Sequence, residues 1–370
     1  TDVYYISNIF QLSSLKIVFE SAAILGRKSD EKVYHKKYDA LLEKVRFEYF
    51  TANGRLCFDT ITAQALALYF DVVPTEHRAK LAAELYDNVK RHGYKVATGF
   101  IGTPFLLFAL ADNGYIQAAQ KVLMNNAYPG WLYEVDMGAT TIWERWNSLE
   151  TDGNPGPDGM NSYNHYAYGS AMEFVYRRIA GIEQLEIGFK RVRIAPNPCK
   201  GLAEIRAEYN STNGSIVAGY KQKNGKITFF TEIPEGVTAE IVLPNEGKVA
   251  EGNGTFEFIR DWEELDVPTF GKDNLLTEIC NNPKALKAFS TVFGDIFKEV
   301  QNPFSLYPAT IEEFAEYLNI AGFDEKLAKA NSEFLRFSLY ASTQTSGNGS
   351  SRIRRTSRPH ENSGFGRSQE

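Results

Sequence analysis

The spacing of apolar residues changes near Gly181, and this change constrains the fold more than any other feature of the chain. Upstream, apolar side chains recur three, four or seven positions apart in two segments, Tyr5, Ile9, Leu12, Phe19 and Ala22, then Tyr34, Tyr38, Leu41, Val45 and Tyr49. Downstream, apolar and polar residues alternate over 204–209 and 227–233. The pattern predicts a helical region followed by a β-domain.

Start and stop signals divide the region before Gly181 into short helices. Ser29 is expected to cap the second helix and Thr75 the fourth, while Thr103-Pro104 opens a helix that ends near Gly114. Short helices joined by brief loops can form a bundle, a solenoid or a closed α/α toroid. No motif repeats at a fixed period, which counts against the solenoid.

The region after Gly181 predicts a small antiparallel β-domain over about 185–267. Asn213-Gly214 and Asn224-Gly225 are dipeptides typical of tight hairpin turns. Helical spacing returns after Gly271 and indicates a separate small module. From Ser342 onward the chain is rich in Ser, Gly, Arg and Asn, a composition that cannot bury enough apolar surface to offset the entropy of ordering. We expect disorder there.

Composition excludes several classes of partner and cofactor. A net charge of −6 provides no basic surface for nucleic acid, and no apolar run is long enough to cross a membrane. Cys57, Cys199 and Cys280 are widely spaced, which predicts reduced thiols in a cytoplasmic protein. The five histidines form no metal-ligand pattern, and phosphate-binding glycine motifs are absent, so neither a metal nor a cofactor is expected.

The chain starts with neither Met nor a signal peptide, so we expect it to begin partway through a longer protein. The sequence leaves the oligomeric state open.

The segment Trp143-Glu144-Arg145-Trp146 is the strongest candidate for chemistry. Sugar rings stack an apolar face on indole, and their hydroxyl groups need polar or charged partners, so a carboxylate between two tryptophans is typical of a sugar site. The alternative is a packed helix end with a Glu–Arg pair and two core indoles. Small and polar residues on both sides, Gly138–Thr141 and Asn161–Gly169, favour loops beside a cavity.

Two further residues are weaker candidates. His165 is predicted at the start of the last helix before Gly181, where it could contact substrate or play only a structural part. Asp59 precedes an Ala/Leu-rich helix; we favour a capping role for it and keep substrate binding as the alternative.

Four ordered motifs together resemble the bacterial α-L-rhamnosidases of glycoside hydrolase family 78. These motifs are Thr98–Leu107, Tyr128–Tyr133, Gly138–Trp146 and Gly159–Gly169, and the resemblance covers about residues 1–245. It implies part of an (α/α)6 toroid over 1–182 and a C-terminal antiparallel β-sandwich over 183–268. A small helical module over 269–341 and a disordered tail over 342–370 lie outside the family pattern.

The resemblance also implies a mechanism and a substrate. The family hydrolyses terminal α-L-rhamnosides with inversion, using two carboxyl groups and no metal. Its general base carries over to Glu144, and Trp143, Trp146 and His165 would line the sugar pocket, with Asp59 a further candidate contact. The family's general acid lies in an upstream Asp-Glu-Arg-Leu-Gly-Trp segment, which residues 1–60 do not match. The expected partner is a rhamnose-containing oligosaccharide or glycoside.

Two other functions stay open from the sequence. The chain could bind rhamnose or another carbohydrate without cleaving it, because a base without its acid loses protonation of the leaving group. It could also belong to an α/α-toroid enzyme for another sugar, either a glycosidase or a lyase.

Overall fold

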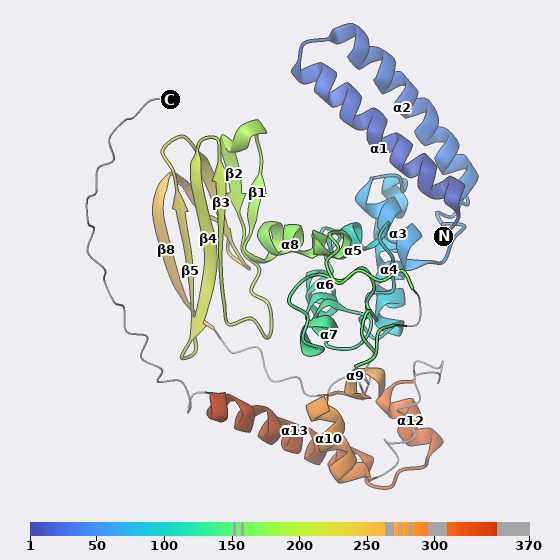
Figure 1. Cartoon of the computed structure of the whole chain (residues 1–370), viewed down its shortest axis with the longest axis vertical. Helices are drawn as coiled ribbons and strands as arrows, with labels where there is room; N and C mark the ends of the chain where they lie inside the picture. Colours follow the sequence, from blue (N-terminus) through green and yellow to red (C-terminus); the bar gives the residue numbers. More distant parts are fainter. Residues whose placement is uncertain are drawn as a thin grey trace, which may run out of the picture.

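The computed structural model contains a helical domain, a β-sandwich and a C-terminal helical module (Figure 1). It describes residues 1–150, 153–156, 159–262, 270–272, 274, 276–280, 283–294 and 309–345, of which 277, 283, 284 and 335–345 are described by backbone alone. The change from helices to strands occurs at Gly181, between a π-helical turn over Val175–Ile179 and strand β1 over Ile182–Gln184. The predicted fold class, with part of a toroid followed by a β-sandwich, is confirmed over these residues.

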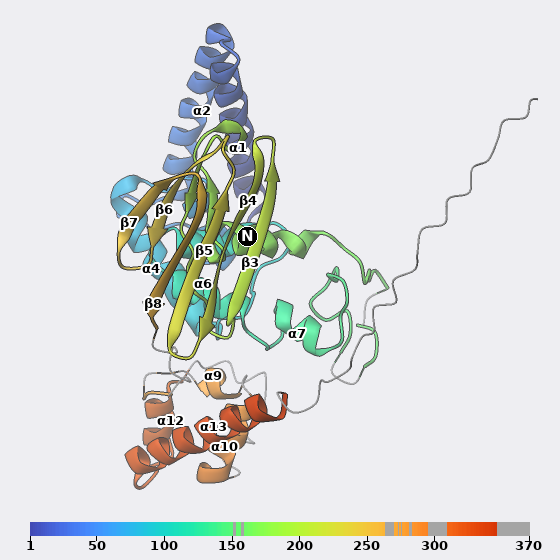
Figure 2. The same ribbon diagram turned by 90° about the vertical axis from the view of Figure 1, so that its left-hand side faces the viewer.

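Helices α1 (Val3–Ile24) and α2 (Lys28–Tyr49) form a long hairpin that projects from the rest of the molecule (Figures 1 and 2). Asp2 caps α1 by accepting a hydrogen bond from the Tyr5 amide. The predicted cap at Ser29 is wrong, because α2 already begins at Lys28, directly after a Gly-Arg turn. The expected apolar faces do meet: Tyr5, Ile9, Leu12 and Val45 are buried.

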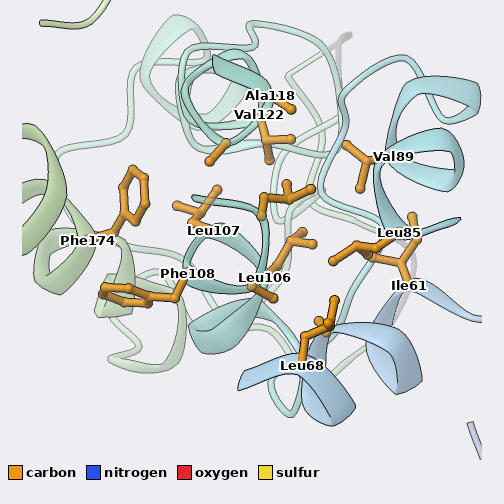
Figure 3. Close-up of a cluster of buried hydrophobic side chains, with 14 of the residues drawn as sticks. Ile61, Leu68, Leu85, Val89, Leu106, Leu107, Phe108, Ala118, Val122 and Phe174 are labelled. Carbon is orange, nitrogen blue, oxygen red and sulfur yellow. The ribbon is translucent and has the colours of Figure 1, made fainter. Parts of the chain in front are cut away.

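The next four helices pack together, with α5 in contact with both α3 and α6, and α4 in contact with α3. They are α3 (Ile61–Tyr69), α4 (Arg78–Arg91), α5 (Thr103–Ala111) and α6 (Ile116–Leu123). Every residue of α5 from Leu106 to Leu110 is buried, and Figure 3 shows apolar side chains of α3, α4 and α6 converging on it. Thr103-Pro104 opens α5 as predicted. The predicted cap at Thr75 is wrong, because Thr75 starts a 3-10 turn and His77 precedes α4 without a side-chain cap.

A long loop separates the last helices of this domain. Helix α7 (Trp131–Asp136) is followed by irregular backbone, and the chain becomes helical again only in a 3-10 turn over Ala167–Ser170 and in α8 (Ala171–Phe174). His165 therefore lies two residues before the helical turn that it was expected to start. All of Gly138–Trp146 lies in this loop.

The β-domain consists of two four-stranded sheets. One has the order β1-β2-β6-β7 and the other β3-β4-β5-β8. The remaining strands are β2 (Arg191–Ile194), β3 (Glu204–Ser211), β4 (Gly214–Lys223), β5 (Lys226–Ile233), β6 (Thr238–Leu243), β7 (Gly247–Gly252) and β8 (Gly254–Asp261). The pairing is antiparallel except that β2 runs parallel to β6, so the expectation of a purely antiparallel domain is wrong at that pair. The Asn224-Gly225 turn has the predicted positive φ at both residues, whereas at Asn213-Gly214 only Gly214 has it.

Two apolar cores lie in and beside the β-domain. One fills the space between the sheets and includes Ile182, Val192, Ile216 and Ile241. The other is the core of the helical domain, which extends into the β-domain through Cys199, Tyr220, Ile227, Phe229 and Leu243. The two domains therefore share buried surface.

The C-terminal module has a core of its own. Its described helices are α9 (Leu276–Cys280), α10 (Pro283–Phe293), α12 (Ile311–Tyr317) and α13 (Phe323–Thr345). Phe270, Phe289, Phe293 and Phe334 pack in this core. Of the predicted disordered tail, residues 342–345 continue α13 and the rest lies outside the described residues.

Candidate active site

The loop between α7 and the 3-10 turn is held by backbone hydrogen bonds between its two motif segments. The Glu144 amide donates to the Ser162 carbonyl oxygen over 2.9 Å, and the His165 amide donates to the Ile142 carbonyl oxygen over 2.8 Å. The Thr141 hydroxyl also donates to the Tyr163 carbonyl oxygen. Residues 141–144 and 162–165 therefore form one hydrogen-bonded unit.

The carboxylate of Glu144 is fixed by the same unit. Its Oε2 accepts a hydrogen bond from the Ser162 amide over 2.9 Å, and the side chain is half-buried. The alternative of a packed helix end is wrong for the backbone, because Trp143–Trp146 is not helical, but the two indoles are buried as that alternative expected. A carboxylate held in place by a neutral amide is oriented yet keeps lone pairs for accepting a proton.

Both tryptophans beside Glu144 are buried. Trp143 is 3% exposed and packs edge-on against Tyr163, with ring centroids 5.9 Å apart. Trp146 is 7% exposed; it stacks on Tyr168 at 3.9 Å and meets Trp131 edge-on. In this structure the two indoles pack against other aromatic side chains beneath the loop. Their contact with sugar stays a prediction.

The imidazole of His165 contacts two aromatic rings. Phe100 stacks on it at 5.0 Å and Tyr166 at 5.3 Å, both nearly parallel. Its Nδ1 accepts a hydrogen bond from the Ala167 amide, so the neutral ring carries its proton on Nε2. Because Nδ1 is occupied by the Ala167 amide, His165 can donate a hydrogen bond to a hydroxyl group through Nε2–H.

Asp59 lines a cavity beside α3 and α4. Thr60 caps α3 by accepting from the Ala63 amide, so the capping role favoured for Asp59 is wrong. The Asp59 carboxylate instead accepts hydrogen bonds from Gln64 and, over 2.7 Å, from Asn88. It lines a cavity of about 450 Å³ whose other walls are Arg55, Leu56, Cys57, Phe58, Gln64, Glu84, Asp87, Asn88 and Arg91. This cavity contains none of the other candidate residues, and the role of Asp59 in substrate binding stays a prediction.

Glu134 on α7 is a further candidate residue that the sequence motifs did not indicate. Its side chain is 2% exposed, and Oε2 accepts a hydrogen bond from the Trp143 amide over 3.3 Å. Burial raises the pKa of Glu134 to about 7, although the hydrogen bond from Trp143 opposes this shift. One available signal was its position, directly after the Tyr128–Tyr133 motif.

The described residues contain no group of three or more His, Cys, Asp or Glu side chains that could hold a metal ion. Cys57, Cys199 and Cys280 are free cysteines. No helix in the described part of the chain combines the length and the apolar character needed to span a membrane.

A carboxylate and hydrogen-bond donors among aromatic rings, on a loop of a paired-helix domain, are typical of proteins that act on carbohydrate. Two family models match the chain: the bacterial alpha-L-rhamnosidase 6 hairpin glycosidase domain over residues 1–179, and the bacterial alpha-L-rhamnosidase C-terminal domain over 181–255. The chain belongs to the bacterial α-L-rhamnosidase family.

Similar proteins agree with this assignment. An α-L-rhamnosidase of Formosa agariphila is 35% identical over 243 residues, which are 65% of this chain and 26% of that protein. The chain thus spans about a quarter of the length of that relative. The crystal structure of the native Aspergillus terreus α-L-rhamnosidase has a TM-score of 0.67 at 31% identity, covering 70% of this chain and 30% of the other. The Streptomyces avermitilis α-L-rhamnosidase complexed with L-rhamnose has a TM-score of 0.65 at 30% identity, covering 69% and 26%.

Proposed function

We propose that this chain carries the general base of an inverting α-L-rhamnosidase, and that Glu144 is that base. The observation that carries the proposal is the Glu144 carboxylate, oriented by the Ser162 amide within a loop of the glycosidase domain. Family membership supports the reaction class, and the L-rhamnose complex of the Streptomyces relative supports the sugar.

In the proposed reaction, Glu144 removes a proton from water as the water oxygen attacks the anomeric carbon of the rhamnoside. The bond from that carbon to the leaving oxygen breaks, and the leaving oxygen takes a proton from a general acid. Inversion requires the two carboxyl groups to be about 6.5–9.5 Å apart so that water fits between them. Residues 1–60 have no match to the family's acid segment, so we propose that this chain supplies only the base.

The remaining candidates receive supporting parts. We propose that His165 donates Nε2–H to a hydroxyl group of the sugar, and that Trp143 and Trp146 shape the pocket wall. Asp59 is proposed as a substrate contact in the cavity that it lines. The substrate is a rhamnose-containing oligosaccharide or glycoside.

A substrate whose leaving group needs no proton tests the base without the acid. We expect the chain to hydrolyse 2,4-dinitrophenyl α-L-rhamnoside slowly and to leave methyl α-L-rhamnoside intact, with β-L-rhamnose as the first product by NMR. Glu144→Gln should lower the rate about 10²–10⁴-fold, the usual size of a general-base contribution.

Two further variants sharpen this experiment. With Glu144→Ala, added azide should replace water and yield the β-rhamnosyl azide. Glu150→Gln is the matched control. Glu150 lies in the same loop and is also half-buried, and within the described residues its carboxylate accepts a hydrogen bond from the Asn147 side chain. If Glu144→Gln turned over as fast as Glu150→Gln, Glu144 would not be the base.

A second candidate function is carbohydrate binding without hydrolysis. It is favoured by the absence of an acid-segment match in residues 1–60. Calorimetry with L-rhamnose distinguishes the two functions: binding together with no release of dinitrophenolate would support the non-catalytic function.

A further inference from the structure

We propose that Glu134 is a positioning residue that holds the loop of the general base against α7. This inference rests on the proposed function for the role of Glu144, but the mechanical link that it describes concerns the loop itself.

Glu134 contacts the loop at two points. Its backbone carbonyl oxygen accepts from the Ala139 amide over 2.9 Å, where the chain leaves α7. Its side-chain Oε2 accepts from the Trp143 amide over 3.3 Å. One residue therefore holds both ends of the segment 139–143, and only the second contact depends on the side chain.

The residues on either side of Trp143 are those that order the candidate base. Ile142 accepts from the His165 amide, and Glu144 both donates to the Ser162 carbonyl oxygen and accepts from the Ser162 amide. The Trp143 N–H and the Ile142 carbonyl oxygen belong to the same planar peptide unit, so the Glu134 carboxyl group and the His165 amide hold that unit from its two sides. Glu144 is the next residue after this unit, and the Glu134 carboxyl group thus acts on Glu144 through the backbone of Trp143.

The surroundings of Glu134 favour an uncharged acid. Its side chain is 2% exposed, and within the described residues no donor reaches its second oxygen, Oε1. The titratable group that faces it is the Tyr168 phenol, whose pKa burial raises to about 12, with a smaller contribution from Glu134. A neutral carboxyl group accepts the Trp143 N–H through a carbonyl oxygen, and an amide oxygen can replace that acceptor.

Amide hydrogen exchange tests the link independently of catalysis. Glu134→Leu removes the acceptor and Glu134→Gln keeps it. Asp136→Leu is the control, since Asp136 lies on the same helix but is exposed and bonds to Asn126. We expect peptides covering 139–146 and 160–166 to exchange about tenfold faster in Glu134→Leu only, because one buried hydrogen bond is lost.

Peptides from α4 and α5 show whether each variant is folded. If Glu134→Leu loses protection there as well, Glu134→Gln decides the matter: wild-type exchange over 139–146 supports the inference, and faster exchange overturns it. If Glu134→Leu is folded and its loop exchanges like the wild type, the inference is wrong.

Turnover of the dinitrophenyl rhamnoside gives the second readout. Glu134→Leu should lower kcat with little change in KM, and Glu134→Gln should restore kcat to within about twofold of the wild type. If Glu144→Gln has no effect on turnover while the exchange results are as expected, the proposed function fails and the positioning role stands. If exchange is unchanged in a folded Glu134→Leu, the positioning role fails and the proposed function is unaffected.

Discussion

Glu134 and Glu144 lie ten positions apart in the chain and differ in how deeply their carboxyl groups are buried. Glu144 is half-buried and bonded to the Ser162 amide, whereas Glu134 is 2% exposed and bonded to the Trp143 amide. Burial without a charged partner penalises the ionised form, and this cost should be measurable in the stability of the protein.

Glu134→Gln should change the dependence of stability on pH. The pKa of Glu134 is raised to about 7 from an ordinary 4.5, so between these values the folded protein binds more protons than the unfolded chain. Stability contributed by the protonated form is complete below about pH 4.5 and is lost as pH rises to about 7. We expect Glu134→Gln to gain about 3 kcal/mol relative to the wild type between pH 4.5 and 8, measured by urea denaturation. Parallel pH profiles for the two proteins would contradict this.

At the scale of elements, the transition from helix to strand depends on the backbone at Gly181. Gly181 has φ +84°, and its carbonyl oxygen accepts from the Ala195 amide, which follows β2. A Cβ atom at this position would lie 2.2 Å from the carbonyl carbon of Ala195. The position therefore needs both a left-handed backbone and the absence of a side chain.

Gly181→Ala should destabilise the protein far more than Gly188→Ala. Gly188 also has a positive φ, +75°, but the nearest atom to its added Cβ, Thr212 Oγ1, is 3.8 Å away. The control variant thus suffers only the conformational penalty of about 1 kcal/mol, and Gly181→Ala adds a backbone clash that brings the loss to about 3 kcal/mol or more. Chemical denaturation of both variants checks this, and equal losses would show that close packing at Gly181 does not matter.

At the scale of the whole molecule, a shared core and a set of ion pairs join the helical domain to the sandwich. Arg178 donates two hydrogen bonds to the Asp112 carboxylate, over 2.6 and 3.0 Å, and one to Glu183 on β1 over 3.0 Å. Its side chain is 15% exposed. Burial alone would raise the pKa of Glu183, but Arg178 and Arg177 outweigh it and hold that pKa below its ordinary value.

Arg178→Met should destabilise this junction by about 1–2 kcal/mol at neutral pH, because it removes the partner of the exposed Asp112 carboxylate and one of the two arginines that pair with the half-buried Glu183. A depressed pKa contributes stability that is present above about pH 4.5 and lost as pH falls below it. The difference between wild type and variant should therefore shrink on acidification. Lys226→Met is the control: it removes an exposed ion pair with Asp261, and its denaturation midpoint should match the wild type. A junction variant as stable as this control would show that the ion pairs do not couple the domains.

Features that depend on neighbours in the sequence could be predicted, and features that depend on distant neighbours could not. The Trp143–Trp146 loop follows from the small and polar residues around it, and the Asn224-Gly225 turn from its own backbone preference. The capping role predicted for Asp59 was wrong because the next residue, Thr60, is the N-cap of α3 and accepts the hydrogen bond from the Ala63 amide. The burial of Glu134 depends on how α7 packs against a loop ten residues away, which no local pattern contains.

The order and spacing of residues along this chain were sufficient to predict the change from helices to strands at Gly181, the two long helices α1 and α2, and Glu144 as a candidate for chemistry. Each of these depends on periodicity or on a short motif, which act over a few residues. The tertiary structure alone decided the parallel pairing of β2 with β6, the cavity around Asp59 and the hydrogen bond from the Trp143 amide to the buried Glu134 carboxyl group. These features arise from contacts between segments brought together by burial of the common core, so their free energy belongs to the packed molecule.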